Sequence, residues 1–149
     1  MTVITISREF GSRGSQIAED VAGVLGYHFA DKALIADILS QYGYIRFGHD
    51  YDTLPGFLSR FDSQRTQMVN MLNRVILALA AHGNIVILGR GSFALLAGYA
   101  NVLNVRTQAP FPIRIRRIIE EQNISPIQAE TLVNENDVVR ANFIESSYK

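Results

Sequence analysis

The chain has 149 residues, a length that suits one domain with a single hydrophobic core. Its 48% hydrophobic and 19% charged residues are ordinary for a globular protein, and the net charge of zero argues against a general binder of nucleic acid polymers or membrane surfaces. The absence of cysteine excludes disulfides, thiolate metal sites and a cysteine nucleophile. A strand begins almost at the first residue and no apolar run approaches the roughly 20 residues of a membrane span, so we expect a soluble, cytoplasmic protein.

The first part of the chain predicts two strand-helix pairs. Residues 3–6 form a short β-branched run, and residues 27–31 are the next candidate strand. Gly26 stands where the first helix needs a left-handed C-terminal cap, and Asp31 stands where the second needs an N-cap. Helical spacing predicts the inner face of each helix. For the first helix these residues are Ile17, Val21, Val24 and Leu25, and for the second they are Leu34, Ile35, Ile38 and Leu39.

Residues 43–60 are rich in Gly, Tyr and Asp and follow neither period, which predicts a mobile excursion rather than a second domain. A long helix is expected from about 61 to 82. The apolar run 84–88 and the run 101–105 predict two further strands, with a short helix between them.

The C-terminal part of the chain predicts two helices. A basic helix begins near Pro110, and Ser125-Pro126-Ile127-Gln128 forms a capping box with proline at the first helical position.

The alternation of strands and helices predicts an α/β layered domain with a mostly parallel sheet. Functional sites in such sheets lie at the carboxyl ends of the strands. The segments expected there are 7–15, 30–32, 89–92 and 106–108. Arginine and lysine occur in them, which indicates an anion-binding site.

The turn after the first strand, R-E-F-G-S-R-G-S at 8–15, is a candidate phosphate-binding loop. Free backbone amides and the positive end of a helix dipole attract anions at such a corner, and glycines let the backbone approach them. The pattern G-x-x-x-x-G-K-[ST] is not met, because Arg8 replaces its first glycine and Gly14 its lysine. Both a phosphate site without lysine and a simple glycine-rich corner therefore stay open. The candidate residues are Arg8, Gly11, Ser12, Arg13, Gly14 and Ser15.

A second group of arginines is a candidate for catalysis. Arg114 and Arg117 share a helix face by their i,i+3 spacing, whereas Arg116 is expected in solvent. Cations at a helix start oppose its dipole, and phosphoryl transfer needs guanidinium groups around the transferring oxygens. Arg140 either completes this group or pairs with Asp137 along its helix.

Three segments resemble the cytidylate-kinase-like family, a P-loop branch related to the nucleoside-monophosphate kinases. The opening, ITISREFGSRGSQIAEDVAGVLGYHFADKALI, is similar to the family's I-S-R-E-[YF]-G-S-G-G, which also lacks the lysine. IVILGRGSFAL is similar to its G-R-G signature, and RIRR with the later Asp137, Arg140, Phe143 and Tyr148 resembles its lid and post-lid segment. The resemblance covers nearly the whole chain except residues 43–60. It implies a three-layer P-loop NTPase-like domain over 1–149, with a four-stranded sheet in the order 2-3-1-4.

The resemblance also implies a function. It predicts a phosphotransferase that moves the γ-phosphate of ATP to a nucleoside monophosphate or another small acceptor. Mg²⁺ would be held mainly through the nucleotide phosphates, with Ser15 as a contact. Asp31, Lys32 and Arg90 are the implied acceptor-binding residues. Residues 43–60 would be the acceptor arm and 109–130 a lid-like region.

Departures from the family pattern support an alternative. In the loop, relatives have glycine where this chain has Arg13 and a basic residue where it has Ser15. Cytidylate kinases have an acidic residue at the position of Gly91. Relatives also continue beyond Tyr148 into one more strand and helix. The alternative is a catalytically weak or inactive relative that binds a nucleotide or phosphate and acts as a sensor or subunit. A plain α/β scaffold with solvated arginines is a third possibility. The sequence gives no indication of the oligomeric state.

Overall fold

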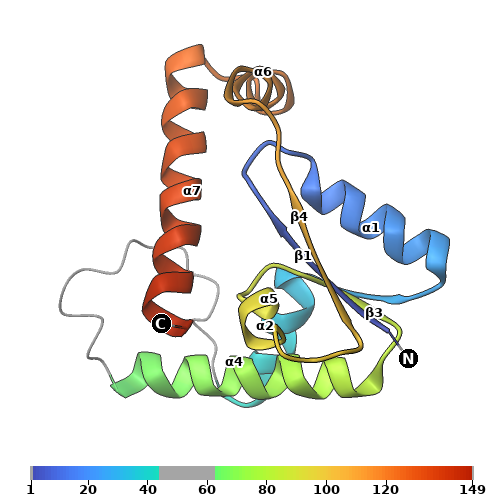
Figure 1. Ribbon diagram of the computed structural model, residues 1–149. Coiled ribbons are helices and arrows are strands. Elements are labelled where there is room, and N and C mark those ends of the chain that lie inside the picture. Colours follow the sequence, from blue (N-terminus) through green and yellow to red (C-terminus); the bar gives the residue numbers. More distant parts are fainter. Residues whose placement is uncertain (1, 44–62, 149) are drawn as a thin grey trace.

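The structure of the protein, a computed structural model, describes residues 2–43 and 63–148 (Figure 1). The side chains of residues 64 and 65 are also outside this description. Apart from Gly43, the segment 43–60 lies outside the described residues, so its prediction as a mobile arm stays a prediction. Within the described residues, no helix is both long and apolar enough to cross a membrane.

The sheet has four parallel strands in the order β2-β3-β1-β4. The strands are β1 (Val3–Arg8), β2 (His28–Ala30), β3 (Ile85–Leu88) and β4 (Val102–Thr107). Val3 pairs with Ile85 on one side and with Val102 on the other. The predicted order 2-3-1-4, with the first and third strands adjacent at the centre, is confirmed.

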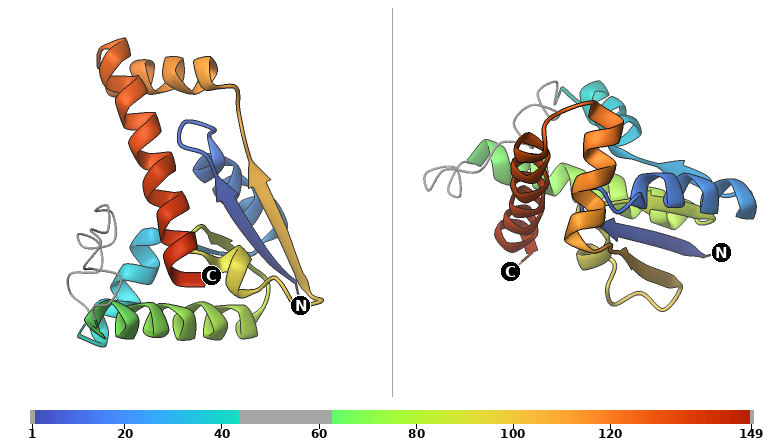
Figure 2. Two further views of the ribbon diagram at one scale, coloured as in Figure 1. Left: turned by 60° about the vertical axis from the view of Figure 1, so that its left-hand side comes forward. Right: turned by 90° about the horizontal axis from the view of Figure 1, so that it is seen from above.

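Helices cover both faces of this sheet (Figures 1 and 2). They are α1 (Gly14–Leu25), α2 (Lys32–Gln41), α4 (Ser63–His82), α5 (Ser92–Leu95), α6 (Phe111–Gln122) and α7 (Pro126–Tyr148). α1 covers one face, and α2, α4 and α5 lie on the other. Helices α6 and α7 form a hairpin beyond the carboxyl edge of the sheet, and the C-terminal end of α7 returns toward α4.

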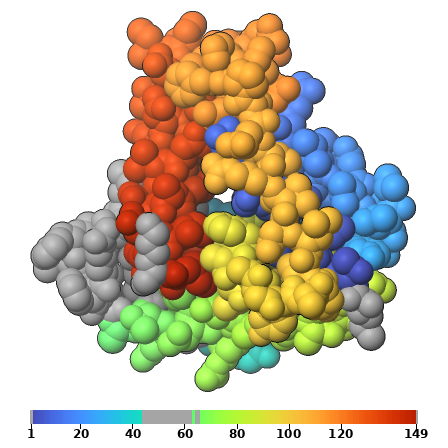
Figure 3. All heavy atoms as spheres, viewed as in Figure 1, coloured from blue at the N-terminus to red at the C-terminus, as the bar shows by residue number. Residues whose placement is uncertain are grey.

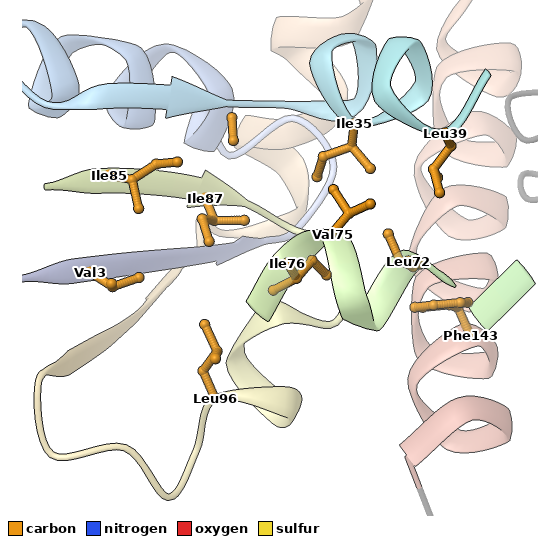
Figure 4. Close-up of a cluster of buried hydrophobic side chains, with 11 residues drawn as sticks. Val3, Ile35, Leu39, Leu72, Val75, Ile76, Ile85, Ile87, Leu96 and Phe143 are labelled. Atoms are coloured by element: carbon orange, nitrogen blue, oxygen red, sulfur yellow. The ribbon is translucent and has the colours of Figure 1, made fainter. Parts of the chain in front are cut away.

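The larger core lies between the sheet and helices α2 and α4 (Figure 4). Ile35 and Leu39 of α2 and Leu72 and Ile76 of α4 are fully buried there. Phe143, from the far end of the chain, packs against the same cluster and so connects α7 to the body of the domain. Leu34, predicted for the inner face of α2, is instead 39% exposed.

The predicted inner stripe of α1 is wrong for three of its four residues; the fourth, Val21, is partly buried and packs against the sheet. Val24 is 87% exposed, and Ile17 and Leu25 also lie on the solvent side. The helix contacts the sheet instead through Ala18 and Ala22 and begins with the buried Gly14. These small residues, spaced four apart, let α1 approach the strands closely, a requirement that counting hydrophobic residues does not detect.

The predicted helix ends are confirmed. Asp31 Oδ1 accepts a hydrogen bond from the amide of Leu34 at 2.9 Å, and Gly26 has φ +64°. Ser125 and Gln128 form the reciprocal capping box, with bonds of 3.0 and 3.3 Å. These caps satisfy backbone groups that helix ends leave without partners.

The close approach of α1 generates a stability prediction. Ala18→Leu adds volume at a fully buried position against the sheet, so we expect a loss of about 1–3 kcal/mol in the free energy of unfolding. The matched control, Val24→Leu on the exposed side of α1, should change it by less than about 0.5 kcal/mol. Denaturant titration measures both, and equal effects would contradict the packing described.

Candidate active site

A cavity of about 890 Å³ lies between the carboxyl edge of the sheet and α7. Figure 3 shows the molecule hollowed between α7 and β4. Basic side chains from four helices and strands and from the turn after β3 line it, namely Arg8, Lys32, Arg90, Arg106 and Arg140. Its acidic lining residues are Glu9, Glu135, Asp137 and Glu145. The predicted clustering of basic residues at this edge is therefore present.

Arg8 ends β1 and reaches sideways over the neighbouring strand. A Cβ atom at Gly89, the first residue after β3, would collide with Nη1 of Arg8. The pKa of Arg8 is lowered to about 10, chiefly by burial and further by the positive charges of Arg140 and Arg90. Its Nε is buried and has no hydrogen-bond partner. Arg8 remains charged at neutral pH, in an environment that does not compensate this charge fully.

The turn from β1 to α1 leaves backbone amides available at the helix start. Arg13 occupies the N-cap position with φ +62° and makes no side-chain cap. The first intrahelical bond runs from the amide of Ile17 to the carbonyl of Arg13, so the amides of Gly14, Ser15 and Gln16 have no intrahelical acceptor. The side chains of Arg13 and Ser15 are exposed beside these amides. The helix start thus has the features that attract an anion.

The side chain of Ser12 stabilises the turn through hydrogen bonds within the protein. Its hydroxyl donates to the carbonyl of Glu9 at 2.8 Å and lies 3.0 Å from Oγ1 of Thr107. Ser12 is buried, so its hydroxyl joins the turn to β4.

The two glycines of the turn are explained by protein packing. A Cβ at Gly14 would meet Oγ1 of Thr107 and lie 2.5 Å from the Cβ of Arg8. Gly11, with φ +78°, lies against the backbone of Arg114, whose carbonyl oxygen would be 3.0 Å from an added Cβ. A larger side chain at position 14 therefore disturbs packing before it tests phosphate binding.

Asp137 of α7 joins the turn to both C-terminal helices. Its Oδ1 accepts a hydrogen bond from the amide of Phe10 at 3.0 Å, and its Oδ2 accepts one from Nη1 of Arg114 at 2.6 Å. Arg114, only 7% exposed, also donates to the carbonyls of Phe10 and Ala109, each at 3.1 Å. We call these contacts the Asp137 network. The guanidinium of Arg114 is thus bound by protein groups.

Glu9 extends this network, a role that the sequence did not suggest. Its Oε2 lies 3.5 Å from Nε of Arg114 and accepts the amide of Ala109 at 3.3 Å. Its Oε1 accepts from Gln108 and lies 3.9 Å from Arg106. Glu9 and Asp137 are far apart in sequence, and no spacing pattern indicates that they share a partner.

Arg117 and Arg140 both contact the turn. Nη1 of Arg117 donates to the carbonyl of Gly11 at 3.2 Å, so it shares the loop-facing side of α6 with Arg114, while Arg116 is exposed as expected. Nη1 of Arg140 donates to the carbonyl of Arg8 at 3.1 Å, and its guanidinium lies 5.6 Å from the ring of Phe10.

The G-R-G turn places Arg90 at the cavity. Arg90 has φ +57°, between two glycines of φ +71°. The ring of Tyr148 fills the space that a side chain at Gly91 would occupy. The Tyr148 hydroxyl donates to Oδ1 of Asn73 at 2.7 Å, and burial raises the pKa of Tyr148 to about 12. Packing by Tyr148 thus accounts for glycine at position 91.

Of the other predicted residues, Lys32 lines the cavity, while the carboxylate of Asp31 caps α2. Residues 11–15 lie at the helix start, and none of them lines the cavity. The site therefore has two parts, one at the start of α1 and one at the cavity. The described residues contain no group of three or more histidine and carboxylate side chains that could hold a metal ion.

The Asp137 network generates a second stability prediction. Asp137→Ala leaves the buried Arg114 guanidinium and the Phe10 amide without their carboxylate, so we expect a loss of about 1.5–3 kcal/mol in the free energy of unfolding. Glu130→Ala, an exposed carboxylate on the same helix, should change it by less than about 0.5 kcal/mol. Urea unfolding separates the two variants, and indistinguishable midpoints would show that the network is not stabilising.

Several solved structures have a similar fold. An uncharacterized protein from Eubacterium ventriosum matches with a TM-score of 0.74 at 18% identity, covering 97% of this chain and 76% of that one. Shikimate kinase from Bacteroides thetaiotaomicron matches with a TM-score of 0.56 at 12% identity, covering 98% and 82%.

Shikimate kinase from Acinetobacter baumannii, in complex with shikimate, matches with a TM-score of 0.51 at 15% identity, covering 99% and 81%. None of the curated proteins matches the sequence. The model of the cytidylate kinase-like family matches residues 3–149, nearly the whole chain. With its kinase-like fold and the expected signature segments, the chain belongs to the cytidylate kinase-like family.

Proposed function

We propose that the protein is a nucleotide-dependent phosphotransferase that moves the γ-phosphoryl group of ATP to a nucleoside monophosphate or another small acceptor. The observation that carries this proposal is the presence of two anion-attracting features at one edge of the sheet. These are the open amides at the start of α1 and the arginine-lined cavity beside α7. The family and the kinase-like fold support the same reading.

The start of α1 is the proposed donor site. The amides of Gly14, Ser15 and Gln16 and the helix dipole attract the ATP phosphates, the dipole contributing on the order of 1 kcal/mol. Charge-assisted contacts from Arg13 and Arg117 add roughly 1.5–3 kcal/mol each where water is excluded. The dipole and the two arginines together supply about 4–7 kcal/mol. Micromolar affinity needs about 8 kcal/mol, so hydrogen bonds from the three amides would have to supply the rest in place of a lysine. Mg²⁺ would be held mainly by the phosphates, with the Ser15 hydroxyl as a further ligand.

The cavity is the proposed acceptor site, with Lys32 and Arg90, which line it, and Asp31, which precedes Lys32, as the binding residues. In the reaction an acceptor oxygen forms a bond to the γ-phosphorus while the bond to the ADP oxygen breaks. Positive groups around the equatorial oxygens supply most of the catalysis. Arg117 and Arg140 are the proposed catalytic arginines. Arg114, also predicted as catalytic, would join them only by exchanging its bond to Asp137 for one to phosphate.

A second candidate function is a nucleotide- or phosphate-binding relative with weak or no catalysis, acting as a sensor or subunit. Three observations favour it. The loop has Gly14 in place of lysine, Arg114 is bound by Asp137, and Tyr148 covers Gly91. The lysine of ordinary P-loops follows the transferring phosphoryl group, so its absence affects turnover more than binding.

Arg13→Gly tests the donor site. It removes a charge beside the helix start and relieves a non-glycine residue from a positive φ, so the variant should fold while its ATP affinity falls about 10- to 100-fold. Arg116→Ala, an exposed arginine on α6, is the control and should bind ATP as the native protein does. Calorimetric titration with ATP and Mg²⁺ measures both affinities.

Release of ADP in the presence of a panel of nucleoside monophosphates then separates the two functions. Acceptor-dependent ADP release supports the phosphotransferase. Binding of ATP without such release supports the inactive relative. If neither the native protein nor the control binds ATP, the phosphotransferase and the nucleotide-binding relative are both excluded, and only a relative that binds phosphate alone is left.

A further inference from the structure

Two of the three histidines of the chain lie beside each other at the amino edge of the sheet, opposite the cavity. His28 begins β2, and His82 ends α4. Their ring centroids are 5.3 Å apart, and the ring planes cross at 80°. Both side chains are exposed, and neither imidazole makes a hydrogen bond within the part of the chain that the structure describes. The ring nitrogens are therefore accessible to a ligand from solvent.

The backbone between α4 and β3 holds the two histidines together. Gly83 and Asn84 have φ values of +73° and +49°, so the chain leaves α4 and enters β3 within two residues. The carbonyl of Asn84 accepts a hydrogen bond from the amide of His28 at 2.9 Å, and His28 pairs with Ile85 in the sheet. The proximity of His28 and His82 thus follows from strand register and from the end of α4.

The separation of the two rings suits a shared metal ion. Two imidazoles that bind one tetrahedral zinc ion through bonds of about 2.1 Å have ring centroids roughly 5 Å apart. The observed 5.3 Å agrees with this value. Each ring can turn about its bond to the metal, so crossed ring planes are compatible with chelation. Because both side chains are exposed, rotation about their side-chain torsions can direct one nitrogen of each ring toward the same ion.

The surroundings favour a cation and restrict its kind. His82 lies in the last turn of α4, where the carbonyl groups at a helix end carry a partial negative charge. Imidazole suits zinc, copper and nickel, whereas Mg²⁺ prefers oxygen ligands. The described residues hold no group of three or more such ligands, so water must supply the remaining positions around an ion at this pair. These features indicate a reversible site for a transition metal and not a site for the Mg²⁺ of a nucleotide.

We propose that His28 and His82 form a binding site for a divalent transition-metal ion of the zinc, copper and nickel class. The bound ion links β2, an edge strand of three residues, to the end of α4. Because the ion binds the folded arrangement of the two rings, it stabilises the folded protein. The site is independent of the proposed phosphotransferase function, since it lies at the other edge of the sheet and takes a different ion.

The test uses Zn²⁺ alone as the probe and the full chain without a polyhistidine tag. His28→Ala and His82→Ala each leave a single imidazole, so calorimetric titration should show Zn²⁺ affinity lowered by roughly tenfold or more in either variant. The double variant should lose little beyond either single one, because the two ligands act as one chelate. Zn²⁺ should raise the melting temperature of the native protein but not that of the variants. Mg²⁺ at the same concentration should leave it unchanged.

His49→Ala, which replaces the third histidine of the chain, is the control and should retain native Zn²⁺ affinity. His28→Gln and His82→Gln, which keep a polar side chain, replace the alanine variants if those do not fold. Native Zn²⁺ affinity in a variant at position 28 or 82 overturns the proposal, and so do equal losses at all three histidines. Binding to the native protein no tighter than about 1 mM also overturns it. ATP binding and ADP release test the phosphotransferase separately and should be unchanged in the variants.

Discussion

The carboxylate of Asp137 holds together the three segments around the site. One of its oxygens accepts the amide of Phe10, 127 residues away in sequence, and the other accepts Nη1 of Arg114. These bonds place the α6–α7 hairpin over the carboxyl edge of the sheet, which gives the cavity one of its walls. They also place Arg140, one turn further along α7, within reach of the backbone at Arg8. Both the geometry of the turn and the convergence of arginines depend on this carboxylate.

Small residues are the second requirement of the site. Gly14, Ala18 and Ala22 let α1 approach the sheet, while Gly89 and Gly91 leave room for Arg8 and Tyr148 respectively. In each case a protein side chain or strand occupies the space that the missing side chain leaves. A glycine-rich sequence at such an edge thus has a packing explanation that is independent of any ligand. The anion-binding argument depends instead on the helix-start amides and on the guanidinium groups.

The sequence predicted those parts of the fold that local patterns determine. Continuous apolar runs identified the central strands 3–6 and 85–88, and single residues such as Asp31 and Ser125 marked the helix starts. The buried face of α1 was predicted wrongly because hydrophobic periodicity favours large side chains, whereas close helix-sheet contact selects small ones.

The candidate site was predictable only in outline. Because the carboxyl ends of parallel strands lie at one edge of a sheet, Arg8, Arg90 and Lys32 could be predicted to lie near one another. Pairings between distant segments carry no local signal, so the partners of Arg114 and the role of Glu9 required the three-dimensional structure.

The single, long α7 has a mechanical consequence. Its C-terminal end is anchored by Phe143 in the core and by Tyr148 on Asn73, whereas its N-terminal end lies out with α6 beyond the sheet. At 1.5 Å per residue, Pro126 lies about 25 Å from Phe143 along the helix, and Arg140 only about 5 Å. A tilt of about 10° around the anchored end would therefore displace the α6 end by about 4 Å and Arg140 by about 1 Å. In such a tilt the outer end of the helix would move several times farther than the guanidinium of Arg140, which would stay close to the end of β1.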